Sequence, residues 1–97
     1  MHVISYKRIR EFINNHPDSY VSLGKWYKRM KKGKYHNLHE LKKKFSGVDY
    51  IGNDRYVFNI GGNKYQLVAM INFNAHRAYI RFIGTHADYS NTDCKNI

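Results

Sequence analysis

Apolar and polar residues alternate with a period of two through the second half of the chain, a pattern that predicts strands. Four such runs lie at residues 48–52, 55–60, 64–73 and 77–84. A loop of about two residues within Gly61-Gly62-Asn63 joins the second run to the third, and the turn Asn74-Ala75-His76-Arg77 leads into the fourth. Short turns of this kind favour antiparallel hairpins. We therefore expect a meander in which each strand pairs with the next.

The first half of the chain has the period of amphipathic helices instead. Apolar side chains recur every three or four residues over residues 6–15 and again over residues 20–32. Pro17 separates the two helices, because the residue before a proline is pushed out of the helical region. Asp18 or Ser19 is a candidate N-terminal cap for the second helix.

Three further signals complete the predicted architecture. Gly33 is placed to end the second helix, and Asn37 is placed to cap a third, short one. Residues 2–5 predict a first strand, with Ser5 as a possible cap for the helix that follows. The sequence thus predicts a single α+β domain over residues 1–97. An N-terminal strand and two to three helices are expected on one face of a small antiparallel sheet.

Turns of even length between the strands fix which residues share a face. One face is expected to be apolar and to carry the helices; it holds Tyr56, Phe58, Ile60, Tyr65, Leu67, Ala69, Ala78, Ile80 and Phe82. The opposite face collects Arg55, Asn59, Lys64, Gln66, Tyr79 and Arg81. A slip of one residue would bury Arg81 and Gln66, so the register is well specified. A half-buried antiparallel sheet always has a polar face, which leaves a plain solvated surface as the alternative.

The chain is strongly basic, and most of the excess positive charge lies in residues 1–50. Seventeen Lys and Arg residues face seven Asp and Glu residues, for a formal charge of +10. Such a charge attracts polyanions, and nucleic acid is the leading partner. Lys28, Lys31, Lys32 and Lys43 are predicted to contact RNA, where they would set affinity and salt dependence but not sequence choice. Solvated helix faces are the alternative reading of these lysines.

Cysteine usage and hydropathy bear on the compartment. Cys94, the one cysteine, has no partner for an internal disulfide and lies near a chain end that is expected to fray. This fits a reducing compartment. The sequence shows no N-terminal apolar segment of the signal-peptide type and no apolar run of membrane-spanning length. We expect a cytoplasmic protein without a membrane partner.

The candidate catalytic residues lie where the last predicted strand ends. Gly84-Thr85-His86 leaves the predicted sheet beside its polar face, and cations with a histidine are typical of a phosphate-binding, acid–base site. His86 is the candidate general acid or base, because histidine titrates near neutrality. Arg81 and Lys64 are candidate phosphate clamps, with solvated charges as the alternative. The spacing of His36 and His39 lacks further ligands, so no metal or other cofactor is expected.

Two segments carry a family resemblance. Residues 53–65, with Phe-Asn-Ile-Gly-Gly-Asn at 58–63, and residues 79–89, with Gly-Thr-His-Ala-x-Tyr at 84–89, resemble the HigB family of bacterial toxins. The opening strand and the helix around Trp26 are also similar, so the resemblance covers nearly the whole chain. It implies a RelE-like toxin fold of the RelE/ParE superfamily.

The resemblance also implies an activity. HigB-type toxins cleave mRNA on translating ribosomes without a metal and are neutralised by a HigA-type antitoxin, so ribosomal RNA becomes an expected partner. The ribose 2′-OH would attack the phosphate, helped by acid–base groups. His86 and Tyr89 match the family's C-terminal catalytic pair, and Tyr89 would stack on a base or orient the nucleophile.

One residue departs from the superfamily pattern. Gln66 falls where a RelE-type toxin carries an arginine, so Arg55 or Arg81 is expected to stabilise the phosphate, or the site is weaker. Asn59 and Gln66 are the expected amide contacts to RNA. Two other functions stay open: ParE-like relatives share the fold and act on DNA gyrase, and a basic RNA-binding domain needs no catalytic group.

Overall fold

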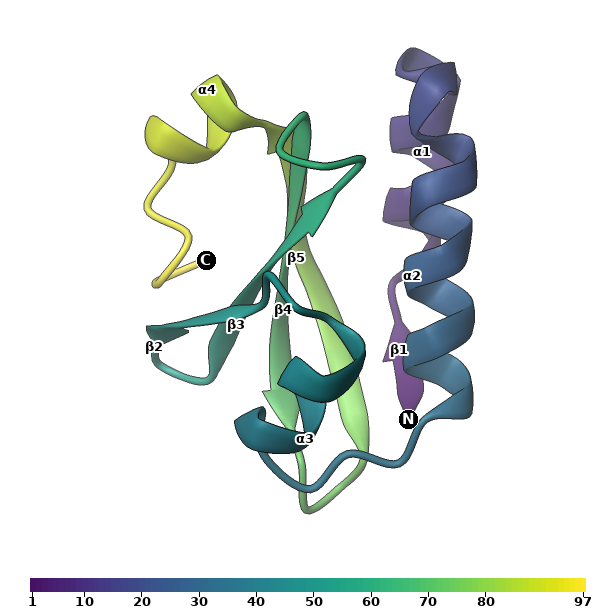
Figure 1. Cartoon of the computed structure of the whole chain (residues 1–97). Helices are drawn as coiled ribbons and strands as arrows, with labels where there is room; N and C mark the ends of the chain where they lie inside the picture. The colour runs from purple at the N-terminus through teal and green to yellow at the C-terminus, as the bar shows by residue number, and fades with distance from the viewer.

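A five-stranded sheet divides the molecule into two sides (Figure 1). The computed structural model describes all residues from 1 to 97. The strand order is β1-β5-β4-β3-β2; β1 runs parallel to β5, and every other neighbouring pair is antiparallel. The strands are β1 (His2–Ile4), β2 (Asp49–Gly52), β3 (Arg55–Ile60), β4 (Tyr65–Asn72) and β5 (Arg77–Thr85). The predicted meander is confirmed.

Helices cover one side of the sheet, as the sequence predicts. The helices α1 (Tyr6–Asn15) and α2 (Tyr20–Lys32) stand together, on the right in Figure 1. A 3-10 turn, η1 (Pro17–Ser19), joins them, and α3 (Leu38–Lys44) follows. A fourth helix, α4 (His86–Ser90), lies on the opposite side and was not predicted. The predicted α+β fold is therefore confirmed, with one added element.

The predicted helix caps are confirmed in part. Asn37 accepts a hydrogen bond from the Glu40 backbone N–H at 3.0 Å, so it caps α3 as expected. Ser5 stands in the N-cap position of α1, but its side chain makes no capping bond and its backbone has a left-handed φ of 76°. Ser19 donates its hydroxyl to the His16 carbonyl at 2.6 Å and caps nothing. Gly33 ends α2.

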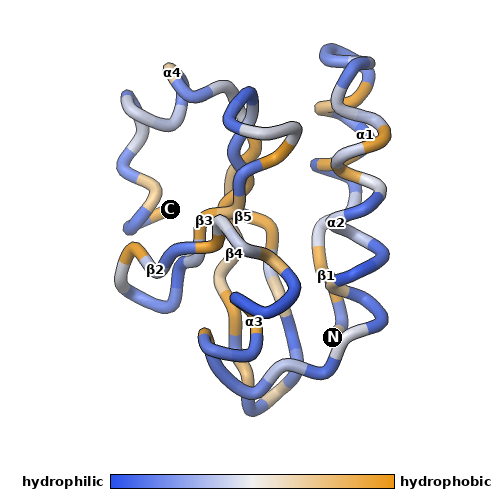
Figure 2. The backbone as a smooth tube through the Cα atoms, in the orientation of Figure 1, coloured by the Kyte–Doolittle hydropathy of each residue, from blue (hydrophilic) through white to orange (hydrophobic).

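The main core lies between the helices and the predicted apolar sheet face. Phe58 pairs with Leu67 and Ala69 with Ile80, and all four side chains are buried. The helices contribute Ile9, Leu23, Trp26, Met30 and Leu41. Apolar residues accordingly follow the strands in Figure 2. Burial of such side chains stabilises the fold by about 1.5–3 kcal/mol each.

The turn between β3 and β4 explains the predicted register. Ile60 pairs with Tyr65, which leaves a four-residue turn of even length. Gly61 and Gly62 there have φ values of 63° and 70°, a backbone region that only glycine adopts without strain. An even turn keeps alternate residues on the expected faces along β3 and β4.

A bulge in β5 overturns one predicted orientation. Ala69 pairs with Ile80 while Val68 pairs with Phe82, so Arg81 is an extra residue in the ladder. Beyond the bulge the alternation is inverted. Phe82 therefore lies on the side away from α1 and α2, and Ile83 packs against the main core. The prediction that Phe82 faces the helices was wrong, because pattern alone does not reveal an inserted residue.

The C-terminal segment covers part of the second sheet face, on which the sequence predicted no helix or strand. Cys94 packs on Val57 and Val68 as a second, smaller apolar cluster, flanked by Phe82 and Tyr89. Cys94 is only 3% exposed, so the expectation of a frayed end was wrong. Burial raises the pKa of the Cys94 thiol.

Burial of Cys94 predicts slow modification. In the native protein, thiol reagents should label Cys94 on the order of a hundredfold more slowly than in urea, because the tail must first open locally. Timed labelling with a chromogenic disulfide, at matched pH, measures this, and no other cysteine contributes to the signal. Equal labelling rates in the folded and unfolded protein would contradict the packing described.

Candidate active site

The second face of the sheet is organised in three cross-strand rows. Asn59, Gln66 and Gly84 form the row nearest α4. Val57, Val68 and Phe82 form the middle row, which is apolar and lies under the C-terminal segment. The third row holds Arg55, Met70 and Tyr79. The middle row therefore separates the two polar ends of this face.

Two residues of the first row lie beside His86, so three of the predicted site residues come together here. The Nδ1 atom of His86 lies 3.3 Å from Oε1 of Gln66. Nε2 of Gln66 donates in turn to Oδ1 of Asn59 at 3.4 Å. Because an amide oxygen only accepts, Nδ1 of His86 must carry the proton in this contact. In the neutral imidazole the other ring nitrogen, Nε2, is then unprotonated and able to take a proton.

Local sequence explains how His86 reaches this place. Thr85 caps α4: its hydroxyl accepts from the Asp88 N–H at 3.1 Å, and the Asp88 carboxylate accepts from the Thr85 N–H at 3.2 Å. This capping box starts the helix at His86 directly after β5. A side chain at Gly84 would come within 2.6 Å of the Phe82 ring, so a larger residue there would displace that ring. The Thr85-x-x-Asp88 pattern was the missed signal for α4.

Tyr89 lies on the inner side of α4. Its ring meets that of Phe82 with centroids 6.2 Å apart, and it borders the small cluster around Cys94. Burial raises the pKa of Tyr89, with Cys94 and Asp49 adding to the effect. The phenol is therefore protonated at neutral pH and can donate a hydrogen bond, but it is a poor base.

The two arginines predicted to stabilise the phosphate lie beyond the apolar row. Arg55 donates through Nε to the backbone oxygen of Ile97 at 3.1 Å and through a second nitrogen to Asn53 at 2.9 Å. Arg81 stands at the bulge, with its guanidinium 5.5 Å from the Tyr79 ring centre, and its buried Nε has no hydrogen-bond partner. The structure does not place either arginine beside His86.

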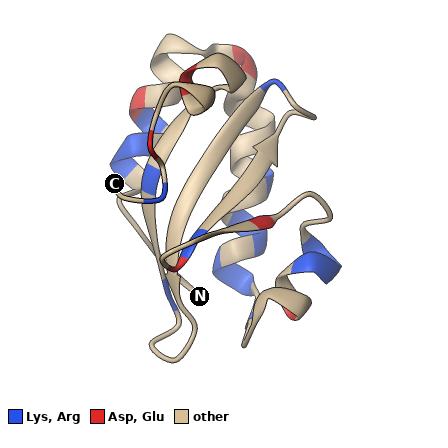
Figure 3. Cartoon of the chain, turned by 90° about the vertical axis from the view of Figure 1, so that its left-hand side faces the viewer, with Lys and Arg blue, Asp and Glu red and all other residues tan.

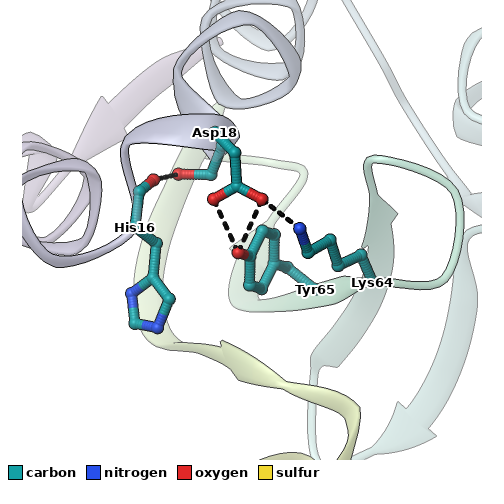
Figure 4. Close-up of polar contacts among 5 residues, drawn as sticks. His16, Asp18, Lys64 and Tyr65 are labelled. Carbon is teal, nitrogen blue, oxygen red and sulfur yellow. Dashed lines mark hydrogen bonds and ion pairs between the residues drawn. The ribbon is translucent and has the colours of Figure 1, made fainter.

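Lys64 also has a partner that the sequence did not suggest. Its Nζ binds the carboxylate of Asp18, which also accepts from the Tyr65 hydroxyl at 2.7 Å (Figure 4). Asp18 belongs to η1, so this contact ties the helical layer to the start of β4. Hydrogen bonds from Lys64 and Tyr65 lower the pKa of Asp18, and the Asp18 carboxylate raises the pKa of Lys64. Tyr65 pairs with Thr85, so Lys64 still lies at the His86 end of the sheet.

The predicted RNA-binding lysines lie on the helices. Lys28, Lys31 and Lys32 line a groove of about 880 Å³ between α1 and α2, together with Tyr6 and Tyr20. Lys43 is exposed on α3. Figure 3 shows the same distribution, with most basic residues on helices and few on strands. These lysines form a surface apart from the row that holds His86.

Comparison with known proteins identifies the family. The family model HigB_toxin, the RelE-like toxic component of a toxin–antitoxin system, matches residues 19–92. This chain belongs to the HigB toxin family. It is 33% identical over 92 residues to mRNA interferase toxin HigB of Escherichia coli K12, a match that covers 92% of this chain and 88% of the relative. The mRNA interferase HigB of Shigella flexneri matches to the same extent.

A further HigB protein gives the same result. The mRNA interferase HigB of Escherichia coli O6:H1 is 30% identical over 91 residues, with 92% of this chain and 88% of the relative covered. The resemblance that residues 53–65 and 79–89 carry is thereby confirmed. No helix is long and apolar enough to cross a membrane. No group of three or more His, Cys, Asp or Glu side chains is arranged to hold a metal ion.

Replacing Gln66 should move the acidic limb of the activity profile. In Gln66→Glu a carboxylate replaces the amide beside His86 and favours the imidazolium over the neutral ring. If His86 acts as a base, the pH at which activity reaches half its maximum should rise. Asn72→Asp adds the same charge at the far end of β4 and is the control. An unshifted profile in Gln66→Glu would rule out this contact as the support of His86.

The Asp18 contact predicts an acid-dependent term in stability. The pKa of Asp18 is lower in the folded chain than in the unfolded one, so the contact stabilises the fold above the unfolded pKa, about 3.9. That contribution is lost as pH falls through the lower, folded value. Urea unfolding from pH 7 to pH 2 should show this loss in the wild type and a smaller one in Asp18→Asn. Asp54→Asn, in an exposed turn, should keep the wild-type slope.

Proposed function

We propose that this protein is a ribosome-dependent mRNA endonuclease of the bacterial cytoplasm that a HigA-type antitoxin neutralises. Family membership makes the chain the toxic component of a toxin–antitoxin system, and the name of its relatives, mRNA interferase, supports an endoribonuclease. The observation that carries the proposal is the His86–Gln66 contact. It holds an exposed imidazole at the sheet edge with Nε2 free.

RNA supplies its own nucleophile for the reaction. His86 Nε2 takes the proton from the ribose 2′-OH, the oxygen attacks the adjacent phosphorus, and the bond to the 5′-oxygen of the next nucleotide breaks. The leaving oxygen needs a proton, and the products are a 2′,3′-cyclic phosphate and a 5′-hydroxyl. Tyr89 is the candidate donor to the leaving group or to the phosphate, because its raised pKa keeps it protonated. The reverse assignment gives His86 the acid role.

The added charge on the phosphate requires a cation. Lys64 is the proposed clamp, since it lies next to Tyr65, the partner of Thr85. Its ion pair with Asp18 is exposed, and exposed pairs contribute little, so a phosphate can replace the carboxylate. Arg81 and Arg55 lie beyond the apolar row, and we assign them to phosphates other than the one that reacts.

The same geometry supports the proposed dependence on the ribosome. The site offers one histidine and a tyrosine on an open surface, so much of the rate must come from positioning of the mRNA. Lys28, Lys31, Lys32 and Lys43 are the proposed contacts to ribosomal RNA, because they form a basic helical surface apart from His86. The ribosome would then hold both the toxin and the codon.

Cleavage by variant proteins tests the function. Wild-type protein should cut mRNA on translating ribosomes and leave the same RNA intact when it is free. His86→Ala should lower the rate by about 10²–10⁴, the usual contribution of a general acid or base. Tyr89→Phe keeps the packing on Phe82 and should also be slow. His2→Ala, at an exposed position of β1, is the matched control and should retain full activity.

Primer extension after timed incubation reads each cut, and circular dichroism checks that each variant is folded. Addition of the HigA-type antitoxin should abolish cleavage by the wild type. Full cleavage by both His86→Ala and Tyr89→Phe would reject the site. Intact mRNA together with inhibited gyrase would favour a ParE-like function instead.

A further inference from the structure

A basic cleft opens at the outer edge of β3. It has a volume of about 360 Å³ and is bounded by α2, the segment after α3, the end of β3 and the turn that follows. Its polar lining includes Arg29, Lys44, Asn59 and Asn63. A second hollow of about 220 Å³ shares Arg29 and Asn59 with it and adds Lys25. Neither lining contains an acidic side chain, so the joined cleft is positively charged.

The cleft exists because β2 is short. The pairing of β2 with β3 ends at Asp49 and Val57, so the stretch from Phe58 to Ile60 has no strand on its outer side. The chain passes close by at Gly47, where an added side chain would lie 2.8 Å from Nδ2 of Asn59. Glycine at this position thus keeps the approach to the Asn59 amide open.

Asn59 connects this cleft with the His86 row. It lines both hollows, and its Oδ1 accepts from Gln66, whose Oε1 faces His86. Neighbouring strands lie about 5 Å apart, so the cleft begins within about two strand spacings of His86. An RNA strand with its reactive phosphate at His86 can follow this row directly into the cleft.

The cations of the cleft are free to bind an anion. Neither Arg29 nor Lys44 takes part in an ion pair. The guanidinium of Arg29 makes only a long hydrogen bond, 3.5 Å, to the backbone oxygen of Lys44. Arginine binds phosphate oxygens through two parallel N–H groups, and lysine adds a point charge. Both residues are exposed, so their charges are available on the surface.

Trp26 borders the second hollow. It is 3% exposed, and its indole N–H is shielded from solvent and has no hydrogen-bond partner. Trp26 is also the one tryptophan of the chain. Because its ring lines this hollow, its fluorescence is sensitive to a ligand that binds there.

We propose that the cleft of Arg29, Lys44 and Asn59 binds the phosphodiester backbone of single-stranded RNA immediately next to the bond that His86 attacks. The inference rests on the proposed function for the identity of the polyanion. It adds cations from α2 and from the end of α3 to the site, next to the phosphate that Lys64 is proposed to bind. The cleft fixes the RNA strand, while His86 and Tyr89 act on the neighbouring phosphate.

A fluorescence titration tests the cleft without cleavage. The probe is a short single-stranded oligonucleotide with every ribose 2′-O-methylated, which lacks the attacking hydroxyl. Binding to the wild type should change Trp26 fluorescence. Arg29→Gln with Lys44→Gln should weaken binding about tenfold, because two charge-assisted contacts are lost. The slope of log affinity against log salt should fall by about 1.4, since each phosphate contact on a single strand contributes about 0.7.

A matched double variant controls for net charge. Lys7→Gln with Arg10→Gln removes the same two charges from exposed positions of α1. It should bind within about twofold of the wild type, because a local contact and not long-range attraction dominates. Equal weakening by the two double variants, or no weakening by Arg29→Gln with Lys44→Gln, would overturn the proposal.

Two further outcomes separate this inference from the proposed function. His86→Ala should bind the methylated probe as the wild type does, because the cleft does not include His86. Probe binding that follows the expected pattern, together with no cleavage on ribosomes, would leave the cleft in place and reject the nuclease. Cleavage on ribosomes together with unchanged binding by the cleft variant would reject the cleft and leave the nuclease.

Discussion

The single extra residue in β5 determines how the second face of the sheet is used. The bulge at Arg81 turns Phe82 away from the helices, where it meets Tyr89 beside the Cys94 cluster. That contact holds α4 and the C-terminal segment on this face. It also closes the middle of the face with an apolar row, since a bulge redirects every side chain that follows it in the strand. Without the inversion, Phe82 would lie in the main core and α4 would lose its support.

The same row decides which polar groups can act together. His86, Gln66 and Asn59 lie on one side of it, and the sheet arginines lie on the other. Gln66 supplies a neutral amide beside His86, and its oxygen accepts a hydrogen bond from Nδ1 of the ring. The positive charge comes from the surrounding basic surface, with Lys64 on one flank and the Arg29 cleft on the other.

Much of this fold could be predicted from the sequence, because hydrophobic period and turn length are local signals. The strands, the first three helices and the faces of β3 and β4 follow from alternation and from the even Gly61-Gly62 turn. The bulge, the burial of Cys94 and the Asp18–Lys64 contact could not be predicted, since each depends on residues far apart in the chain. His86, Gln66 and Asn59 were candidate site residues from the sequence, and the structure places these three side chains together. The Arg29 cleft arises from where β2 ends, which no residue pattern marks.

The central claim is that Gln66 holds His86 with its proton on Nδ1, so that Nε2 can take a proton from RNA. Nitrogen-15 NMR of the histidine side chains, assigned with a His86→Ala variant and followed from pH 5 to pH 9, measures this most directly. The account predicts that neutral His86 carries its proton on Nδ1 in the wild type. In Gln66→Leu, which offers no acceptor, the proton should move largely to Nε2, the usual tautomer of a free imidazole. An Nε2-protonated neutral His86 in the wild type would contradict the account.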